Sequence, residues 1–146
     1  MGRRVVILCG PPGAGKTTAA QASGLTVFDR DDPQWQSERQ FTDALRVLGR
    51  DSSARAVVIR SGATSSARAR WSRLVVATHV FMVMLPPEEC VRRVKARGRE
   101  DMVRGIVSVP KWFESFDERD GVRPFPGWSA LDDAPGLPLG STSRRW

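Results

Sequence analysis

The feature that most constrains the fold is an apolar, largely β-branched run followed at once by a glycine-rich loop. Residues 5–9 read Val-Val-Ile-Leu-Cys, and residues 10–17 read Gly-Pro-Pro-Gly-Ala-Gly-Lys-Thr. A continuous apolar run of this kind is typical of a buried parallel strand. The loop matches the Gly-x-x-x-x-Gly-Lys-Thr pattern of the Walker A motif, and the alanine-rich stretch after it indicates a helix. This order predicts an α/β fold.

The loop also predicts a nucleotide site. Its glycines let backbone N–H groups turn toward a phosphate, and the helix N-terminus adds the positive end of a dipole. We expect Lys16 to reach the β- and γ-phosphates and the Thr17 hydroxyl to bind Mg²⁺. The expected ligands are therefore ATP, or another nucleoside triphosphate, and Mg²⁺. The residues expected to bind them are Gly10, Pro11, Pro12, Gly13, Ala14, Gly15, Lys16, Thr17 and Thr18.

Strands and helices alternate along the rest of the chain. Further strands are predicted at residues 25–28, 56–59 and 80–85, and helices at 33–48, 67–74 and about 87–97. Asp32 is the expected N-cap of the first of these helices, with Gly49 at its end, and Ser65 or Ser66 caps the second. The alternation predicts a three-layer P-loop NTPase fold, nucleotide-kinase-like, with a short parallel sheet of about four strands flanked by helices.

Two regions are expected along the chain. Residues 1–119 form the P-loop domain, with a lid near 92–104 and a short helix after Pro110 that carries Trp112. Prolines and glycines accumulate from Asp120 onward, which predicts an irregular C-terminal extension over 120–146.

Composition excludes several classes of site. Two cysteines and the single His79 leave no cluster to hold zinc, no disulfide framework and little room for a Ser-His-Asp triad. No apolar run has the length of a membrane span, so we expect a soluble cytoplasmic protein without a membrane partner. The net charge is +7, and residues 46–73 hold seven arginines against one acid. Such a region suits a polyanion such as a nucleic acid, although solvated surface charge explains it equally well.

Carboxylates follow the second predicted strand, at the sheet edge where the phosphate loop also lies. We interpret Asp31 as the general base that takes a proton from an attacking hydroxyl, with helix capping as its alternative role. Asp32 is expected chiefly to cap the next helix, and either carboxylate could hold Mg²⁺ through water. Arg30, Gln34 and Trp35 are candidate acceptor-binding residues. For Trp35, a place in the core is the more frequent role of such a tryptophan.

The loop followed by Phe28-Asp29-Arg30-Asp31-Asp32 resembles the kinase domain of bacteriophage polynucleotide 5′-kinase, in which an Arg-Asp-Asp signature follows the same loop. The resemblance implies that Asp31 is the base acting on a 5′-hydroxyl. It also matches residues 89–98 to the family's lid and implies that Arg93 and Arg97 contact the transferred phosphoryl group. For this helix the alternative is an amphipathic surface helix with Val94 turned inward.

The chain departs from that family at two positions. Arg60-Ser61-Gly62 ends the third predicted strand, where the family has an aspartate near Mg²⁺, and Gln34 replaces an arginine that contacts the acceptor. The leading expectation is an ATP-dependent phosphotransferase acting on the 5′-hydroxyl of DNA or RNA, in the host cytoplasm if the protein is of phage origin. The alternatives are a kinase of a nucleotide, modified base or other small molecule, and an ATP-sensing module that binds nucleic acid or protein without transfer.

Overall fold

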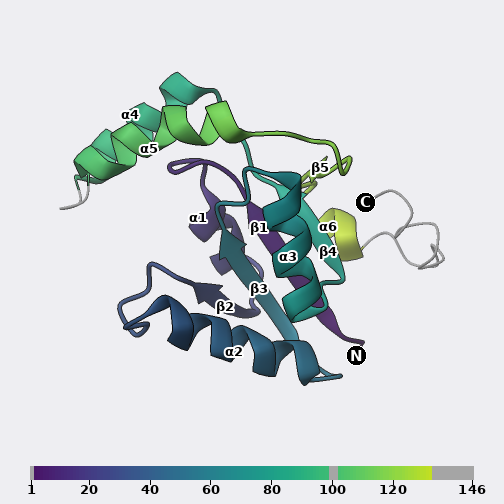
Figure 1. The fold of residues 1–146 in the computed structure, drawn as a ribbon. Helices are drawn as coiled ribbons and strands as arrows, with labels where there is room; N and C mark the ends of the chain where they lie inside the picture. The colour runs from purple at the N-terminus through teal and green to yellow at the C-terminus, as the bar shows by residue number, and fades with distance from the viewer. Residues whose placement is uncertain (1, 99–101, 133–146) are drawn as a thin grey trace.

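The computed structural model describes residues 2–98 and 102–132 of the chain (Figure 1). Within them, five strands form one parallel sheet in the order β2-β3-β1-β4-β5. The strands are β1 (Arg4–Cys9), β2 (Thr26–Asp29), β3 (Arg55–Arg60), β4 (His79–Met82) and β5 (Arg123–Pro124). The helices are α1 (Lys16–Gln21), α2 (Glu38–Arg50), α3 (Ser65–Val75), α4 (Pro87–Arg97), α5 (Met102–Ser115) and α6 (Trp128–Asp132).

The sheet is the middle of three layers, because side chains of its central strand alternate between two cores. Val5 and Ile7 of β1 pack with Phe41 and Leu45 of α2 on one face, where α3 also lies. The opposite face of the sheet is covered by α1 and the short α6. Both faces of β1 are therefore buried, which explains why its sequence is apolar without interruption. The three-layer α/β P-loop fold expected from the sequence is confirmed.

The α4–α5 pair lies beyond one end of the sheet, next to the loop between β1 and α1 (Figure 1). Ala14 of that loop packs with Cys90 and Val94 of α4 and with Val109 of α5. Burial of these apolar side chains holds the helix pair against the loop.

The helix after β2 begins later than its sequence predicts. Ser37, not Asp32, is the N-cap of α2, and its Oγ accepts a hydrogen bond of 3.0 Å from the Gln40 N–H. The Asp32 carboxylate instead accepts from the Gln34 N–H at 3.1 Å, which stabilises a turn. The start at Asp32 was wrong because aspartate before proline is equally typical of a turn.

Two further helix limits differ from the prediction. Thr64, rather than Ser65 or Ser66, caps α3 and accepts from the Ala67 N–H at 3.2 Å. Gly49 lies inside α2 rather than after it. A Cβ at Gly49 would overlap the Leu74 carbonyl oxygen, so this glycine allows α2 and α3 to approach each other closely.

The helix around Pro110 is longer than predicted. It begins at Met102 and continues through Pro110 to Ser115 as α5, because Val109 and Trp112 are buried on both sides of the proline. Tertiary burial here outweighs the cost of a proline in a helix, which local sequence rules alone would weigh more heavily.

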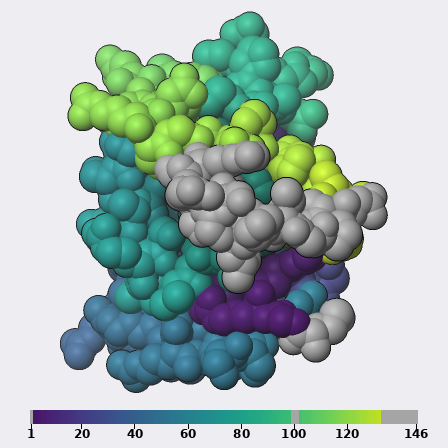
Figure 2. All heavy atoms as spheres, turned by 90° about the vertical axis from the view of Figure 1, so that its right-hand side faces the viewer, coloured from purple at the N-terminus to yellow at the C-terminus, as the bar shows by residue number. Residues whose placement is uncertain are grey.

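The chain after α5 is only partly as expected. Where an irregular extension was predicted, β5 adds a fifth strand beside β4, and α6 follows it. The Trp128 indole N–H donates to the Ala19 carbonyl at 2.7 Å, which fastens α6 to the α1 side of the sheet. Figure 2 shows this segment, in yellow-green, lying below α4 and α5 and above β1. Residues 133–146 of the predicted extension and 99–101 of the predicted lid lie outside the described residues.

No helix in the described ranges 2–98 and 102–132 combines the length and the hydrophobicity that crossing a membrane requires.

Candidate functional site

The phosphate-binding loop runs from β1 to α1 and depends on two glycines in left-handed backbone conformations. Gly13 has a φ of +81° and Gly15, the N-cap of α1, a φ of +97°. A Cβ on Gly13 would lie 2.5 Å from the Cys90 carbonyl oxygen of α4. The two glycines thus meet both the backbone and the steric demands of a loop that curls around a ligand.

The Lys16 side chain folds back over this loop. Its ammonium donates to the Gly10 carbonyl and, at 3.1 Å, to the Pro11 carbonyl. Burial lowers the pKa of Lys16 to about 8, because the charged ammonium loses much of its hydration. A triphosphate bound in the loop would place negative charge beside the Lys16 ammonium and would favour its charged form.

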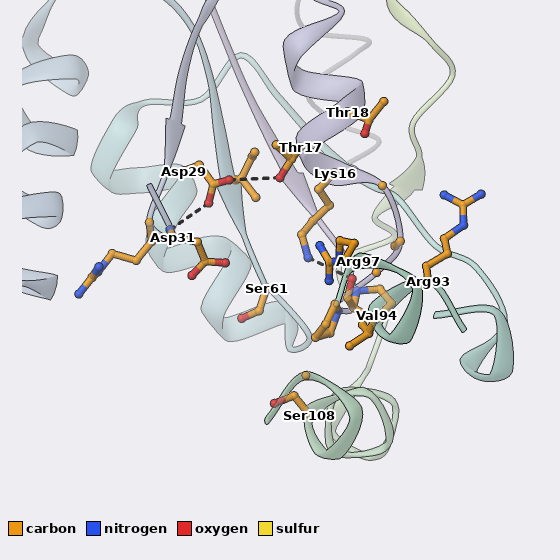
Figure 3. Close-up of a pocket in the computed structure, with 18 of the residues that line it drawn as sticks. Lys16, Thr17, Thr18, Asp29, Asp31, Ser61, Arg93, Val94, Arg97 and Ser108 are labelled. Carbon is orange, nitrogen blue, oxygen red and sulfur yellow. Dashed lines mark hydrogen bonds between the residues drawn. The ribbon is translucent and has the colours of Figure 1, made fainter. Parts of the chain in front are cut away.

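Thr17 and Asp29 form a contact that the sequence did not predict. The Thr17 hydroxyl donates to Asp29 Oδ2 at 3.1 Å, and the other carboxylate oxygen, Oδ1, accepts from the Asp31 N–H at 3.0 Å (Figure 3). Asp29 ends β2, so the sheet itself fixes its position. The bacteriophage kinase family has an aspartate at the end of the third strand, where this chain has Arg60. In this structure the carboxylate in contact with Thr17 is Asp29, at the end of β2.

These groups fit Mg²⁺ bound together with a nucleotide. Mg²⁺ usually takes one or two protein oxygens and completes its shell with phosphate oxygens and water. Thr17 and Asp29 provide a hydroxyl and a carboxylate in contact, and no cluster of three acidic, His or Cys side chains suited to a metal occurs among the described residues. The protein alone would hold the ion weakly, whereas the ion and the triphosphate would bind together.

One pocket of about 900 Å³ extends from the loop to the predicted catalytic residues. It is lined by Lys16, Thr17 and Thr18, by Asp29 and Asp31 after β2, and by Arg93 and Arg97 of α4. Asp31 is exposed to solvent, and its backbone N–H is held by Asp29. Figure 3 shows these side chains around the pocket, with Ser108 of α5 across from the loop.

The α4–α5 pair carries arginines at the edge of this pocket. Arg93 is half exposed and lies 3.5 Å from the Glu89 carboxylate, one turn earlier on α4. Arg104 of α5 lines the pocket together with Arg93 and Arg97. Three cations on two adjacent helices thus line the same pocket as the carboxylates after β2.

The remaining predicted residues divide between the pocket and the core. Arg30 lines the pocket and forms an ion pair of 3.0 Å with Glu38. Trp35 packs between the rings of Phe28 and Phe41, at centroid distances of 6.3 and 5.2 Å. Trp35 therefore has the core position that was expected as its more frequent role, rather than a place beside an acceptor.

Asp32 and Gln34 lie outside the pocket lining, joined in the turn that follows β2. The structure therefore does not place Asp32, one of the two carboxylates that could hold Mg²⁺ through water, in the pocket lining, and it does not place Gln34 there as an acceptor-binding residue.

Several pocket residues were not singled out from the sequence. They are Asp29, Glu38, Arg60, Arg104 and Ser108. Asp29 had a readable signal, since it is the first polar residue after an apolar strand and precedes Asp31 by two positions. Arg104 and Ser108 are four residues apart on one helix face, but the underestimated length of α5 concealed this relation. Glu38 and Arg60 form an ion pair of 2.9 Å that joins α2 to the end of β3, which only the tertiary structure reveals.

No protein-family model and no curated protein matches this chain. Among solved structures, a gluconokinase from Sinorhizobium meliloti 1021 is similar with a TM-score of 0.54 and 16% sequence identity, over 97% of this chain and 88% of that one. Shikimate kinase from Acinetobacter baumannii in complex with shikimate gives a TM-score of 0.49 and 16% identity, over 97% and 92% of the two chains. The resemblance to bacteriophage polynucleotide 5′-kinase is not shown by these comparisons. The chain has a three-layer α/β P-loop fold.

Proposed function

We propose that this protein is a kinase that transfers the γ-phosphate of ATP to a hydroxyl group of a small molecule. The observation that carries the proposal is a single pocket lined by the Lys16 loop, the Asp31 carboxylate and arginines of α4 and α5. Phosphoryl transfer needs a donor site, a group that handles the hydroxyl proton, and cations around the moving phosphoryl group. The pocket has a candidate for each.

The residues act on the reaction in separate ways. Loop N–H groups and the Lys16 ammonium hold the β- and γ-phosphates, and Asp31 orients the acceptor hydroxyl and accepts its proton. The new bond joins the acceptor oxygen to the γ-phosphorus, and the bond from that phosphorus to the β,γ-bridging oxygen breaks, so that ADP leaves. Arg93, Arg97 and Arg104 stabilise the charge on the transferred oxygens. When bound beside Thr17, Mg²⁺ neutralises part of the phosphate charge.

The size of the site and the structural comparison favour a small acceptor. A volume of about 900 Å³ lies in the range usual for small-molecule sites, and the triphosphate takes up part of it. The similar gluconokinase is a kinase of a small hydroxyl compound. The 5′-hydroxyl of DNA or RNA is the second candidate acceptor, favoured by an arginine-lined groove that shares Glu38 and Arg60 with the pocket.

The test is incubation with γ-labelled ATP, Mg²⁺ and a panel of sugars, sugar acids, nucleosides, mononucleotides and 5′-hydroxyl oligonucleotides. With an acceptor found, Asp31→Asn should lower the transfer rate by about 10²-fold or more and change ATP affinity by less than about twofold. Asp32→Asn is the matched control, because the neighbouring carboxylate does not line the pocket.

Undiminished transfer by the Asp31→Asn protein would contradict the assigned base. ATP binding without label on any member of the panel would favour the ATP-sensing module instead. Transfer that falls steeply with added salt would indicate a polyanionic acceptor, because such binding releases counterions.

A further inference from the structure

A second cavity, of about 590 Å³, lies between α2 and α3. The two helices adjoin on the same face of the sheet, where their buried side chains share one core (Figure 1). The charged residues that line this groove are Arg46, Arg60, Arg70, Arg73 and Glu38. Four positive charges against one negative charge make it a shallow, strongly basic groove, and such a concentration of positive charge attracts anions.

Acidic neighbours neutralise only part of this charge. Arg60 is paired with Glu38 at 2.9 Å, and Arg46 with Asp43 at 2.6 Å on the exposed side of α2. Among the described residues no acid forms an ion pair with Arg70 or Arg73, which are three positions apart on α3 and both exposed. Within that part of the chain, two guanidinium groups on one wall of the groove therefore lack a negatively charged partner.

Trp71 organises the arginines on either side of it. The guanidinium carbon of Arg60 lies 3.8 Å from the centre of the Trp71 ring, and that of Arg70 lies 4.9 Å from it. A guanidinium stacked on an aromatic ring keeps its N–H groups free to donate at its edge, in a fork that suits phosphate oxygens. The indole is only 8% exposed, so it is available to hold the arginines but not to stack on a base.

The groove adjoins the candidate active site. Glu38 and Arg60 line both cavities, and Glu38 also pairs with Arg30 in the pocket. A molecule whose hydroxyl lies at Asp31 can therefore extend past the Glu38–Arg60 pair toward Arg70 and Arg73. We propose that this groove binds a phosphate group of the acceptor, an inference that rests on the proposed kinase function and specifies the substrate class.

Phosphate can come from two sources, a small phosphorylated hydroxyl compound or a nucleic acid strand. Binding is therefore measured calorimetrically with ribose 5-phosphate, with uncharged ribose and with a short 5′-hydroxyl oligothymidylate. Saturating ADP and Mg²⁺ are present so that the phosphate loop is filled. The test protein is the double variant Arg70→Gln/Arg73→Gln, and Arg46→Gln tests the opposite wall independently. Arg50→Gln, an exposed arginine at the end of α2 outside the groove, is the matched control.

The double variant should bind phosphate-bearing probes about tenfold or more weakly, whereas the control should bind them as the wild type does. For oligothymidylate the slope of log affinity against log salt should become less steep by about 1.4, since each single-strand phosphate contact contributes about 0.7. Loss of affinity for ribose 5-phosphate supports a small phosphorylated acceptor. Loss for oligothymidylate alone supports a nucleic acid strand.

Unchanged affinity of the double variant for both phosphate-bearing probes, or an equal loss in the Arg50→Gln control, overturns the proposal. The outcome is separable from that of the kinase proposal. Arginine-dependent phosphate binding without transfer to any acceptor would leave the groove assigned and remove the kinase function. Transfer without arginine-dependent phosphate binding would support the kinase function and remove the assignment of the groove.

Discussion

Arg68 offers the sharpest test of how the structure is held together. It is 1% exposed, although it lies in the arginine-rich region that the sequence assigns to surface or polyanion. Its guanidinium donates to the carbonyls of Gly62 (2.7 Å), Ala63 (3.1 Å) and Asp117 (2.6 Å), and to both carboxylate oxygens of Asp120 (2.8 and 2.9 Å). These bonds connect the loop after β3 to the segment that leads into β5. The perturbation is Arg68→Met, which keeps much of the volume and removes every donor.

The magnitude follows from the groups that lose a partner. Three backbone acceptors lose their bonds, at about 1 kcal/mol each. The broken ion pair adds less than a fully buried one would, because Asp120 is 31% exposed and water takes over part of its solvation. We expect a loss of about 3–4 kcal/mol in the free energy of unfolding, a large share of the roughly 5–15 kcal/mol that stabilises a typical domain.

The assay is urea unfolding followed by tryptophan fluorescence, with Arg73→Met, an exposed arginine of the same helix, as a control that should change by less than about 0.5 kcal/mol. Hydrogen bonds from Arg68 hold the pKa of Asp120 below its ordinary value, so its contribution is present at neutral pH and is lost as pH falls through that lowered pKa. Wild-type stability should therefore decline more steeply in acid than that of Arg68→Met. Equal urea midpoints and slopes for Arg68→Met and Arg73→Met would refute the reasoning.

Three further perturbations test the site and the helix packing. Burial lowers the pKa of Lys16 to about 8, so ATP affinity should fall as pH rises through about 8 in a titration. Any ATP affinity that the Lys16→Arg variant keeps should not fall in this range, because arginine stays charged. Asp29→Ala removes the acceptor of the Thr17 hydroxyl and should raise the Mg²⁺ concentration needed for half-maximal nucleotide binding by about tenfold; an unchanged Mg²⁺ requirement would count against the assigned metal role. Gly49→Ala places a methyl group against the Leu74 carbonyl. It should lower the free energy of unfolding by about 1–3 kcal/mol, although alanine has the better helix propensity. A rise in melting temperature would show that α2 and α3 are free to separate.

Local sequence patterns were sufficient to predict those elements whose conformation depends on neighbouring residues. The apolar run 5–9, the glycine loop and the helix after it follow one another without a gap, and each depends on contacts within a few residues or on simple burial. The end of α4 near residue 97 was predicted for the same reason, since Gly98 adopts the left-handed conformation that ends the helix. Lys16, Thr17 and Asp31 could likewise be proposed from their spacing to the first two strands.

Prediction failed where a choice between partners depends on distant residues. Asp29 and Asp31 are equally acidic and nearly adjacent, and only the packing of α1 beside β2 shows that Asp29 contacts Thr17. Pro110 signals a helix start, but burial of Val109 against α4 keeps α5 continuous across it. Strand β5 has two residues and no apolar alternation, so its place beside β4 could not be read locally.

The sequence by itself determined a parallel α/β fold with a phosphate loop at one sheet edge. Backbone conformational preference and strand burial can be predicted from residues that are consecutive in the chain. Only the tertiary structure decided what each arginine of residues 46–73 does. Arg68 is buried and donates hydrogen bonds that connect the loop after β3 to the segment before β5. Arg60 lines both cavities, and Arg70 and Arg73 line the groove. One side-chain type serves all three roles, since the environment that sets the energy of a charge is formed by residues far away in the chain.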